Sequence, residues 1–349
     1  MVTKLNSSIL QKKSCRILII KPSSLGDILH LFPALELIKN FNPTIVADFV
    51  INPEFSPLLD YSPLKINKRI YFERKKLGNL ATCVPEFIKL VKNLRADKYD
   101  FVIDFQGLMR SALISSLARR RYGVVGFANP REHLATYFYS RRVLVPVEHA
   151  VKRNARLVDA ITATANDIPV PQLPSYEQHI PLGLPKKYIV LLPGARWASK
   201  CFPTKLFADI AKLVAEKLPD YSFVVAGAQS DYGRAEQIKN FLPEGFPVIN
   251  FCGKTSMQGL FELLNASSAC ICNDSGPLHI ASMLSKKIYA FYGSTRPELT
   301  GPWGQARVYQ TTDKCLGCLK RECPKSLECH IISPELVAND IFEDLAKMS

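Results

Sequence analysis

The sequence predicts an α/β protein built from two doubly wound halves. Apolar segments rich in Val, Ile and Phe alternate with amphipathic segments of helical period, which is typical of βαβ units and a parallel sheet. The apolar segments are nearly continuous, as expected for strands that are buried on both faces. This pattern runs through the first half, stops at a proline-rich stretch, and then starts again. The 349 residues are about twice the length of a typical domain, which agrees with two domains.

The first half contains a series of expected strands, each an apolar stretch bounded by polar or turn residues. These strands lie at residues 16–21, 44–51, 99–105 and 122–127. Expected helices follow two of them after short turns, at residues 26–41 and 108–120.

Prolines interrupt the pattern between residues 168 and 185, at positions 169, 171, 174, 181 and 185. Proline favours turns and is poor material for a helix or a central strand. We therefore expect a linker at 171–185 between an amino-terminal domain, 1–170, and a carboxyl-terminal domain, 186–349.

The second half repeats the alternation. Its expected strands lie at residues 188–195, 222–228, 248–253, 269–276 and 288–293. Its expected helices lie at residues 204–218, 233–241, 257–266, 277–284 and 334–347. The final helix is also a candidate to pack back on the amino-terminal domain. Ligands of such folds bind at the carboxyl ends of the strands, so a central cleft between the halves is the expected site.

The chain is strongly basic, with 45 Lys and Arg against 31 acidic residues and a net charge of +14. Up to Leu182 the excess is +11, and beyond it only +3. A basic half suggests a polyanionic partner such as nucleic acid, an anionic membrane surface or a phosphorylated substrate. A generally basic proteome is the alternative explanation.

Composition also narrows the class of protein. Hydrophobic residues make up 47% and charged residues 22%, which is typical of a globular protein and excludes disorder and collagen. No apolar run approaches the roughly 18 to 20 residues that span a bilayer, and the first fifteen residues lack the apolar core of a secretory signal. We therefore expect a cytoplasmic protein whose ten cysteines are mainly reduced thiols.

The first strand–helix junction reads KPSSLGDILH, from Lys21 to His30. It lacks both the G-x-G-x-x-G fingerprint and the Gly-Lys-Ser/Thr ending of a phosphate-binding loop. From the residues alone, capping of the helix explains Asp27 better than catalysis does, since Asp and Ser cap helices. His30 is expected to be a packed or hydrogen-bonded side chain.

Two segments of the second half suit phosphate binding. In LLPGARWASKCFP, Gly194 ends a strand, and Arg196 and Lys200 follow on the loop, where they are either phosphate ligands or solvated charges. In NDSGPLH, from Asn273 to His279, a buried strand ends and Pro277 opens a helix. Backbone amides at such a helix start, with a glycine that permits close approach, favour an anion such as a diphosphate.

Two further groups of residues leave the function open. Four cysteines near the end have the spacing C-x2-C-x4-C-x5-C, which matches no standard zinc finger, so a structural metal site is less favoured than free or partly oxidised thiols. They are Cys315, Cys318, Cys323 and Cys329. Basic tracts with aromatics between them suit an ordinary solvated face, a lipid-bearing anion or single-stranded nucleic acid. They include residues 119–121, 131, 137–139, 141–142 and 152–153.

Taken together, these ordered motifs resemble glycosyltransferase family 9, the lipopolysaccharide heptosyltransferases, from about residue 16 to 345. KPSSLGDILHLFPAL resembles the opening strand, loop and helix of the family, and NDSGPLHIASML with YAFYGSTRPELTGPWG resembles its donor-binding loop and following strand. The middle segments, DFQGLMRSALIS, PREHLATYFYSRRV and HAVKRNARLV, are more similar to the heptosyltransferase I subfamily than to heptosyltransferase II.

The resemblance implies a GT-B fold, with two Rossmann-like domains facing a central cleft, and no cofactor or required metal. It implies an inverting transfer of L-glycero-D-manno-heptose from ADP-heptose to Kdo of the lipid A inner core. Asp27 would be the catalytic base, which reverses the preference for capping. The implied donor-binding residues are Gly194, Arg196, Lys200, Asp231, Asp274, Ser275, Gly276 and His279. The implied acceptor-binding residues are Ser24, Gly26, Gln106, Arg119, Arg120 and Arg131.

Two departures from the subfamily concern donor recognition: residues 195–199 replace a Thr-rich, acidic loop, and Gln229 replaces a glutamate, with Asp231 two positions later. The implied acceptor is lipid-borne, so we expect peripheral contact with the cytoplasmic face of the inner membrane and no nucleic-acid partner. The alternatives are heptosyltransferase II or another transferase of the family and, more remotely, a non-catalytic basic protein that binds nucleic acid.

Overall fold

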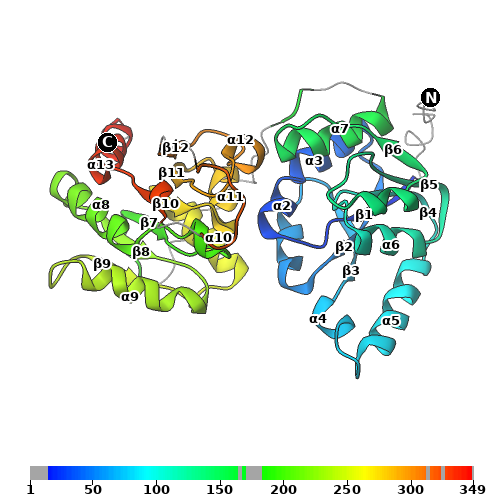
Figure 1. Ribbon diagram of the computed structural model, residues 1–349, viewed down its shortest axis with the longest axis horizontal. Coiled ribbons are helices and arrows are strands. Elements are labelled where there is room, and N and C mark those ends of the chain that lie inside the picture. The colour runs from blue at the N-terminus through cyan, green and yellow to red at the C-terminus, as the bar shows by residue number, and fades with distance from the viewer. Residues whose placement is uncertain (1–14, 164–166, 170–182, 312–314, 324–326, 348–349) are drawn as a thin grey trace. The chain divides into compact units, whose positions relative to one another are not determined.

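The computed structural model describes residues 15–163, 167–169, 183–311, 315–323 and 327–347. The chain divides into two compact units, Met1–Pro171 and Gln172–Ser349. Most of the expected proline-rich linker, residues 170–182, lies outside the described residues. Each unit contains one six-stranded parallel sheet, so the prediction of an α/β fold with two parallel sheets is confirmed (Figure 1).

The sheet of the first unit has the strand order β3-β2-β1-β4-β5-β6. Its strands are β1 (Arg16–Ile20), β2 (Val46–Ile51), β3 (Ile66–Tyr71), β4 (Tyr99–Asp104), β5 (Arg120–Phe127) and β6 (Arg141–Val143). The two central strands, β1 and β4, are almost wholly buried, which explains their continuous apolar sequences. Because β1 lies at the point where the strand order reverses, the turns after β1 and β4 face the usual binding position of this fold class.

Helices cover both faces of the first sheet. They are α2 (Leu25–Leu29), α3 (Phe32–Phe41), η1 (Pro53–Tyr61), α4 (Arg74–Leu77), α5 (Cys83–Arg95), α6 (Met109–Leu117), η2 (His133–Phe138) and α7 (Ala150–Thr162). Helix α3 packs beside α7, whereas α6 packs beside both α5 and η2. Right-handed crossovers place these two groups on opposite faces of the sheet, and Figure 1 shows the same division.

The second unit repeats this plan with the strand order β12-β11-β10-β7-β8-β9. Its strands are β7 (Tyr188–Leu192), β8 (Ser222–Val225), β9 (Val248–Asn250), β10 (Ala269–Asn273), β11 (Lys287–Phe291) and β12 (Arg307–Tyr309). Its helices are η3 (Ala198–Lys200), α8 (Thr204–Lys217), η4 (Gln229–Asp231), α9 (Tyr232–Asn240), α10 (Met257–Ala266), α11 (Gly276–Met283), α12 (Pro297–Thr300), η5 (Glu328–His330) and α13 (Pro334–Ala346).

The last helix, α13, belongs to the core of the second unit. It packs against α8, and its buried apolar residues, such as Ile341, join the apolar cluster beneath that helix. Arg307 of β12 donates hydrogen bonds to Asp340 and Asp344 of α13, at 2.7 Å and 2.9 Å. These contacts place α13 in its own unit, and the expectation that it also packs on the amino-terminal domain stays a prediction.

Two differences from the expected elements have clear physical causes. The helix expected at 26–41 is divided into α2 and α3, because Pro33 lies in the first turn of α3 and cannot continue a helix from before it. Strands β3, β6 and β12 were not expected. All three lie at sheet edges and contain polar or charged residues at positions that a central strand fills with apolar ones.

Candidate active site

The carboxyl edge of the first sheet gathers polar groups from neighbouring strands. Lys21 follows β1 directly, and Asp104 is the last residue of β4, which pairs with the end of β1. The ammonium group of Lys21 is buried and donates a hydrogen bond of 2.9 Å to the carbonyl oxygen of Phe105. Burial lowers the pKa of Lys21, although the nearby carboxylates of Asp27 and Asp104 oppose that shift. The edge therefore holds a buried cation close to two acidic residues.

Asp27 lies in the first turn of α2, and the residue that precedes this helix binds its carboxylate. Oδ2 accepts hydrogen bonds from the backbone N–H of Ser24 at 3.0 Å and from its hydroxyl at 2.7 Å. This is the capping interaction that the sequence favours. Oδ1 makes no hydrogen bond with the rest of the described chain, so one oxygen caps the helix while the other is available to accept a proton. Capping and catalysis are therefore compatible at Asp27, and Gly26 beside it is buried.

The electrostatic surroundings keep Asp27 ionised. Burial alone would raise its pKa, but the charge of Lys21, the two hydrogen bonds from Ser24 and the charge of His30 outweigh burial and lower the pKa to about 2. His30 is buried and packs edge-on against His149, with ring centroids 5.2 Å apart. The expectation of a packed histidine is confirmed.

Asp104 fixes the turn that carries Gln106. This carboxylate is fully buried and accepts hydrogen bonds from the backbone N–H groups of Gln106 and Gly107, at 2.8 Å and 3.2 Å. The hydroxyls of Ser111 and Tyr139 donate to its other oxygen, at 2.8 Å and 2.7 Å. Within the described part of the chain, Oε1 of Gln106 is buried and has no hydrogen-bond partner. The carboxylate of Asp104, whose two oxygens both accept hydrogen bonds, thus holds the turn that carries Gln106, while the side-chain oxygen of Gln106 still lacks a partner among the described residues.

Two arginines bring positive charge to the same edge. Arg131 is exposed and follows Pro130, which packs on Gly107. A Cβ on Gly107 would lie 3.2 Å from the Cβ of Pro130, and the φ of Gly107 is +68°. Glycine is therefore required at this contact. Both Arg131 and Arg153 are close enough to Lys21 to lower its pKa further after burial has done so. Burial also lowers the pKa of Arg153.

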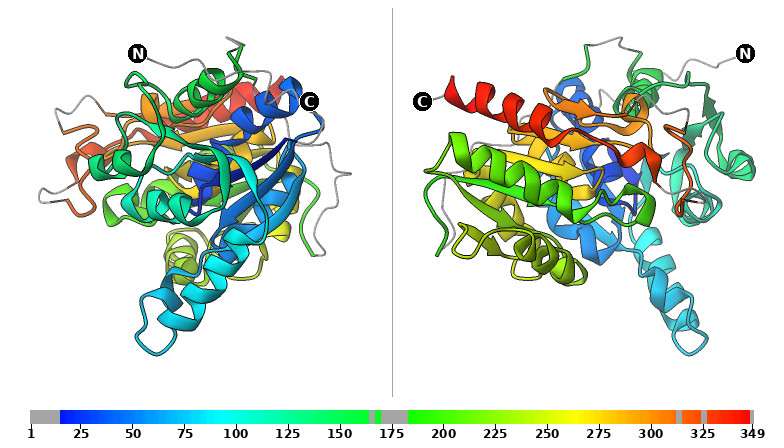
Figure 2. Two further views of the ribbon diagram at one scale, coloured as in Figure 1. Left: turned by 90° about the vertical axis from the view of Figure 1, so that its right-hand side faces the viewer. Right: turned by 60° about the vertical axis from the view of Figure 1, so that its left-hand side comes forward.

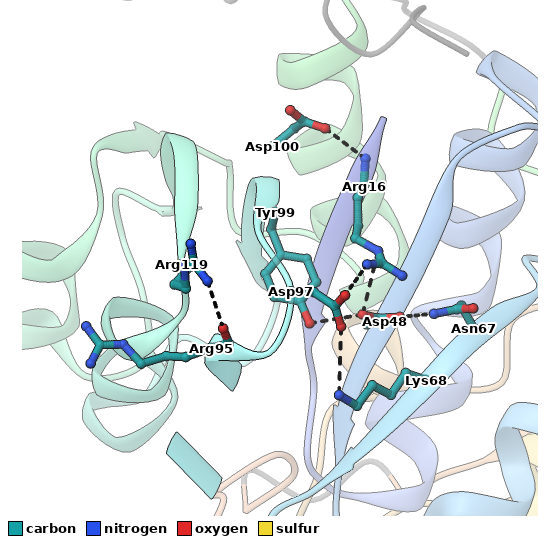
Figure 3. A network of polar contacts seen from close by, with 9 residues as sticks. All are labelled: Arg16, Asp48, Asn67, Lys68, Arg95, Asp97, Tyr99, Asp100 and Arg119. Carbon is teal, nitrogen blue, oxygen red and sulfur yellow. Dashed lines mark hydrogen bonds and ion pairs between the residues drawn. The ribbon is translucent and has the colours of Figure 1, made fainter. Parts of the chain in front are cut away.

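Arg119 and Arg120 lie at the opposite edge of this sheet, so the structure does not bring them together with the other expected acceptor residues. Arg120 begins β5 and pairs with Tyr99 at the beginning of β4. Asp104, at the other end of β4, is about 17 Å away along the strand direction. Arg119 donates to the carbonyl oxygen of Arg95, at 3.5 Å (Figure 3). The two arginines lie where the chain passes from a helix into the start of a strand, and that position in a βαβ unit faces away from the ligand edge.

The amino edge of the sheet contains a structural network of its own. Asp48 is fully buried and accepts hydrogen bonds from the hydroxyl of Tyr99, at 2.9 Å, and from the side chain of Asn67, at 2.8 Å. Arg16 contacts Asp97 in the same network (Figure 3). These contacts connect β1, β2, β3 and the start of β4, so they stabilise the sheet at the end remote from Asp27.

The carboxyl edge of the second sheet brings together the two segments predicted to bind phosphate. Asn273, the fully buried last residue of β10, donates a hydrogen bond of 2.7 Å to the carbonyl oxygen of Pro193, which precedes Gly194. The next residue, Asp274, pairs with the ammonium group of Lys200 at 2.7 Å and accepts from the hydroxyl of Thr295 at 2.6 Å. The loop after β7 and the turn after β10 are thus held as one unit.

Helix α11 begins at this position. Ser275 precedes it, and its Oγ is buried without a hydrogen-bond partner among the described residues. Gly276 is the first residue of the helix, and His279 is buried one turn later. Arg196 is exposed on the neighbouring loop, and the described chain contains no hydrogen bond or ion pair to it. Lys200 also lies over the ring of Trp197, 4.7 Å from its centroid, which fixes the direction of the ammonium group.

Asp231 lies in a space left by two glycines. A Cβ on Gly194 would approach the Asp231 carboxylate to 2.4 Å, and one on Gly227 would approach it to 2.7 Å. One carboxylate oxygen accepts from the backbone N–H of Ala228, at 3.0 Å. Gly194 and Gly227 follow β7 and β8, so the structure brings Asp231 to the same edge as the phosphate-binding candidates.

The four late cysteines do not form a metal site in the described chain. Cys329 is buried and Cys318 is exposed, and no set of three or more His, Cys, Asp or Glu among the described residues is arranged to hold a metal ion. Burial raises the pKa of the Cys329 thiol, and the neighbouring Cys323 and Cys318 raise it further. The cysteines therefore lie close enough to influence one another electrostatically, but in the described chain they do not form a group that could hold a metal ion.

The fold and the two edges are typical of a class of protein: α/β enzymes with two parallel sheets. One edge combines an ionised carboxylate with cations, and the other a glycine turn, a lysine and a helix start. The chain belongs to glycosyltransferase family 9 (heptosyltransferase), whose family model matches residues 87–328. The resemblance seen in the sequence is confirmed.

Individual relatives agree with the family. Lipopolysaccharide heptosyltransferase 1 of Pseudomonas aeruginosa is 29% identical over 320 residues, which cover 88% of this chain and 87% of the relative. Lipooligosaccharide heptosyltransferase 2 of Campylobacter jejuni is 26% identical and covers 96% of this chain and 99% of its own. The solved structure of Escherichia coli heptosyltransferase WaaC with ADP has a TM-score of 0.75 at 25% identity, covering 96% of this chain and 100% of that one.

Several residues at these edges were not identified from the sequence. Lys21 and Asp104 read as the ends of buried strands, although a charged residue at the end of an otherwise apolar strand was an available signal. Arg153 was noted only as part of a basic tract. Thr295 and Asn273 become recognisable only when the ends of neighbouring strands are aligned in space.

Proposed function

We propose that the chain transfers L-glycero-D-manno-heptose from ADP-heptose to Kdo of the lipid A inner core. The assignment of Asp27 as the reacting group is supported by one observation: its carboxylate is ionised at the carboxyl edge of the first sheet, and its Oδ1 is available to accept a proton. The unit that carries Asp27 would bind the acceptor, the second unit would bind the donor, and the two would face a common cleft in a GT-B arrangement.

The proposed reaction is a direct displacement at the anomeric carbon, with inversion. The Kdo hydroxyl forms the new bond to that carbon while the bond to the diphosphate breaks. Asp27, with a pKa of about 2, is always ionised at neutral pH and is ready to accept the hydroxyl proton. It is a weak base, so it accepts the proton late, when bond formation has already made the hydroxyl acidic.

The acceptor would be held by the other groups of the first edge. Ser24 and Gly26 surround the reacting carboxylate, Gln106 offers a buried amide oxygen, and Arg131 offers an exposed guanidinium to phosphate or carboxylate groups. An acidic lipid-borne acceptor also suits the excess charge of the first half. Arg119 and Arg120 are left out of this group because of their position.

The departing diphosphate would be stabilised from the second edge. Lys200 donates to Asp274 and retains two further N–H donors for phosphate oxygens. The backbone amides at Ser275 and Gly276 point along the start of α11 and favour the same negative charge. Arg196 would close over the diphosphate from its exposed loop.

Asp231 would bind the ribose hydroxyls of the donor. Acidic residues near the second strand of nucleotide-binding sheets commonly do so. The chemistry described needs no metal ion, because positive side chains and helix amides carry the charge stabilisation.

The experiment is product formation from ADP-heptose and Kdo2-lipid A in the presence of EDTA, with wild type and Asp27→Asn compared. We expect transfer by the wild type alone, with unchanged ADP-heptose binding in the variant. Normal turnover by Asp27→Asn would refute its role as base. Transfer that stops with EDTA and returns with added metal would refute metal independence.

A second candidate is a heptosyltransferase II, since relatives with that name match nearly the whole chain. It differs from the first in its acceptor, which would be an inner core that already carries one heptose. Offering both acceptors to the same enzyme separates the two: the acceptor with the higher kcat/KM identifies the subtype.

A further inference from the structure

The first unit carries an exposed apolar surface on α4, α5 and the loop between them, which we call the arm (residues 74–95). Leu80 at the loop is 96% exposed, and Val84, Phe87 and Ile88 of α5 are 62%, 45% and 61% exposed. The last three have the spacing i, i+3, i+4, so they lie on one side of the helix. Large apolar side chains that gather at such exposure indicate an interaction site.

The same helix is anchored at its other end. Leu90 and Leu94 of α5 are buried in the apolar core beneath the first sheet. Figures 1 and 2 show α4 and the start of α5, in cyan, extending away from the sheet of this unit. The apolar surface therefore lies on the part of the helix that does not contribute to the core.

The charges on the arm are mostly positive. Glu73 and Glu86, its acidic neighbours, already pair with Lys76, at 2.7 Å and 3.9 Å. Lys75 and Lys92 are exposed and form no ion pair within the described chain. Apolar side chains flanked by unpaired cations complement the interface of an anionic bilayer, where the rings and branched chains enter the headgroup boundary and the lysines meet phosphates.

The arm also adjoins the proposed acceptor edge. Arg74, at its base, lies close enough to Arg110 to influence it: burial lowers the pKa of Arg110, and the charges of Arg74 and Arg131 lower it further.

We propose that the arm docks the protein on an anionic lipid surface through Leu80, Phe87 and Ile88. None of the described helices has both the length and the apolar composition needed to cross a membrane. The arm would supply reversible contact by inserting side chains without crossing. The use of this contact for catalysis rests on the proposed function, because only a lipid-borne acceptor requires the enzyme to reach a bilayer.

The test compares the full chain with the triple variant Leu80→Ser/Phe87→Ser/Ile88→Ser in sedimentation with vesicles. The vesicles contain phosphatidylcholine with phosphatidylglycerol, or phosphatidylcholine alone. The matched control is Leu144→Ser/Val147→Ser, which changes side chains that are 79% and 80% exposed outside the arm. We expect at least about tenfold weaker binding of the triple variant to anionic vesicles, an unchanged control, and weak binding of all proteins to neutral vesicles.

Three results would overturn the proposal. If the wild type does not bind anionic vesicles, the protein has no docking surface for them. If the control variant loses as much vesicle binding as the triple variant, the binding does not depend specifically on the arm. Light scattering that shows a wild-type dimer and a monomeric triple variant assigns the arm to a second copy of the chain instead.

Activity separates this proposal from the proposed function. With a deacylated acceptor in solution, the triple variant should keep wild-type kcat/KM, whereas with acceptor in vesicles it should lose activity. If no acceptor supports transfer but vesicle binding still depends on the arm, the function is wrong and the docking surface remains.

Discussion

Lys21→Met tests whether a buried charge sets the ionisation of the proposed base. Lys21 is the largest of the influences that lower the pKa of Asp27, ahead of the Ser24 hydrogen bonds. The substitution keeps the length of the side chain and removes the charge. Burial, which acts in the opposite direction, remains. We therefore expect the pKa of Asp27 to rise.

The magnitude follows from the present shift. A pKa of about 2 against an ordinary value of 3.8 corresponds to about 2.4 kcal/mol in favour of the ionised form of Asp27. An opposite charge nearby typically supplies one to three pKa units of such a shift. Without Lys21 the pKa should therefore rise by about one to three units, to near or above its ordinary value. A carboxylate is fully ionised roughly two units above its pKa, so wild type, with a pKa of about 2, shows no acid limb from Asp27 above pH 4.

The assay is kcat/KM between about pH 3.5 and 8, measured for wild type, Lys21→Met and Lys21→Arg. We expect the ratio of Lys21→Met to wild type to fall toward the acid end, and the ratio for Lys21→Arg to stay flat. Loss of the ammonium group leaves the carbonyl oxygen of Phe105 without its donor, at a cost of about 1–3 kcal/mol, so thermal unfolding must show that both variants are folded. Folded variants with identical, flat ratios would refute the reasoning.

Three other substitutions test the remaining parts of the site and fold. Lys200→Met should weaken ADP binding at least about tenfold and leave the acceptor KM unchanged, because it removes one charge-assisted contact and leaves Asp274 buried without its cation. Titration calorimetry measures the ADP affinity, and an unchanged affinity would contradict this prediction. Gly194→Ala should raise the KM for the donor, because the new methyl group would lie 2.4 Å from the Asp231 carboxylate and displace it. Steady-state kinetics with varied donor concentration measure this KM, which would not change if Asp231 is remote from the donor. Tyr99→Phe should lower the free energy of unfolding by about 1–2 kcal/mol and leave kcat/KM unaltered, and a loss of activity without a loss of stability would contradict its structural role.

The second unit could be predicted closely because its elements begin and end at strong local signals. Helix α10 has the predicted bounds, and α11 begins one residue before the predicted start, where Pro277 follows a glycine. Such signals depend on a few neighbouring residues, which a sequence displays directly. The sequence also places Gly194 and Lys200 on the loop after one strand and Asp274 on the turn after another, and the structure brings this loop and this turn to one edge.

The sequence is a weaker guide where the position of a residue in the site depends on its place along a strand. Arg119 and Arg120 form a conspicuous basic tract, but they lie at the beginning of β5, whereas Arg131 follows its end. In a parallel sheet these positions face opposite edges, separated by the length of the strand. Charge density in a sequence cannot make this distinction. Strand order and direction can.

Burial explains why similar pairs of residues do different work in the two units. Each sheet has a lysine near an aspartate at its carboxyl edge, Lys21 with Asp27 and Lys200 with Asp274. Lys21 is buried and donates to a backbone carbonyl, so it acts on its aspartate and is out of reach of a ligand. The side chain of Lys200 is 19% exposed, while that of Asp274 is 6% exposed. In the proposed mechanism, therefore, the aspartate of the second pair would orient the lysine that meets the ligand, whereas the lysine of the first pair would keep the reacting aspartate ionised.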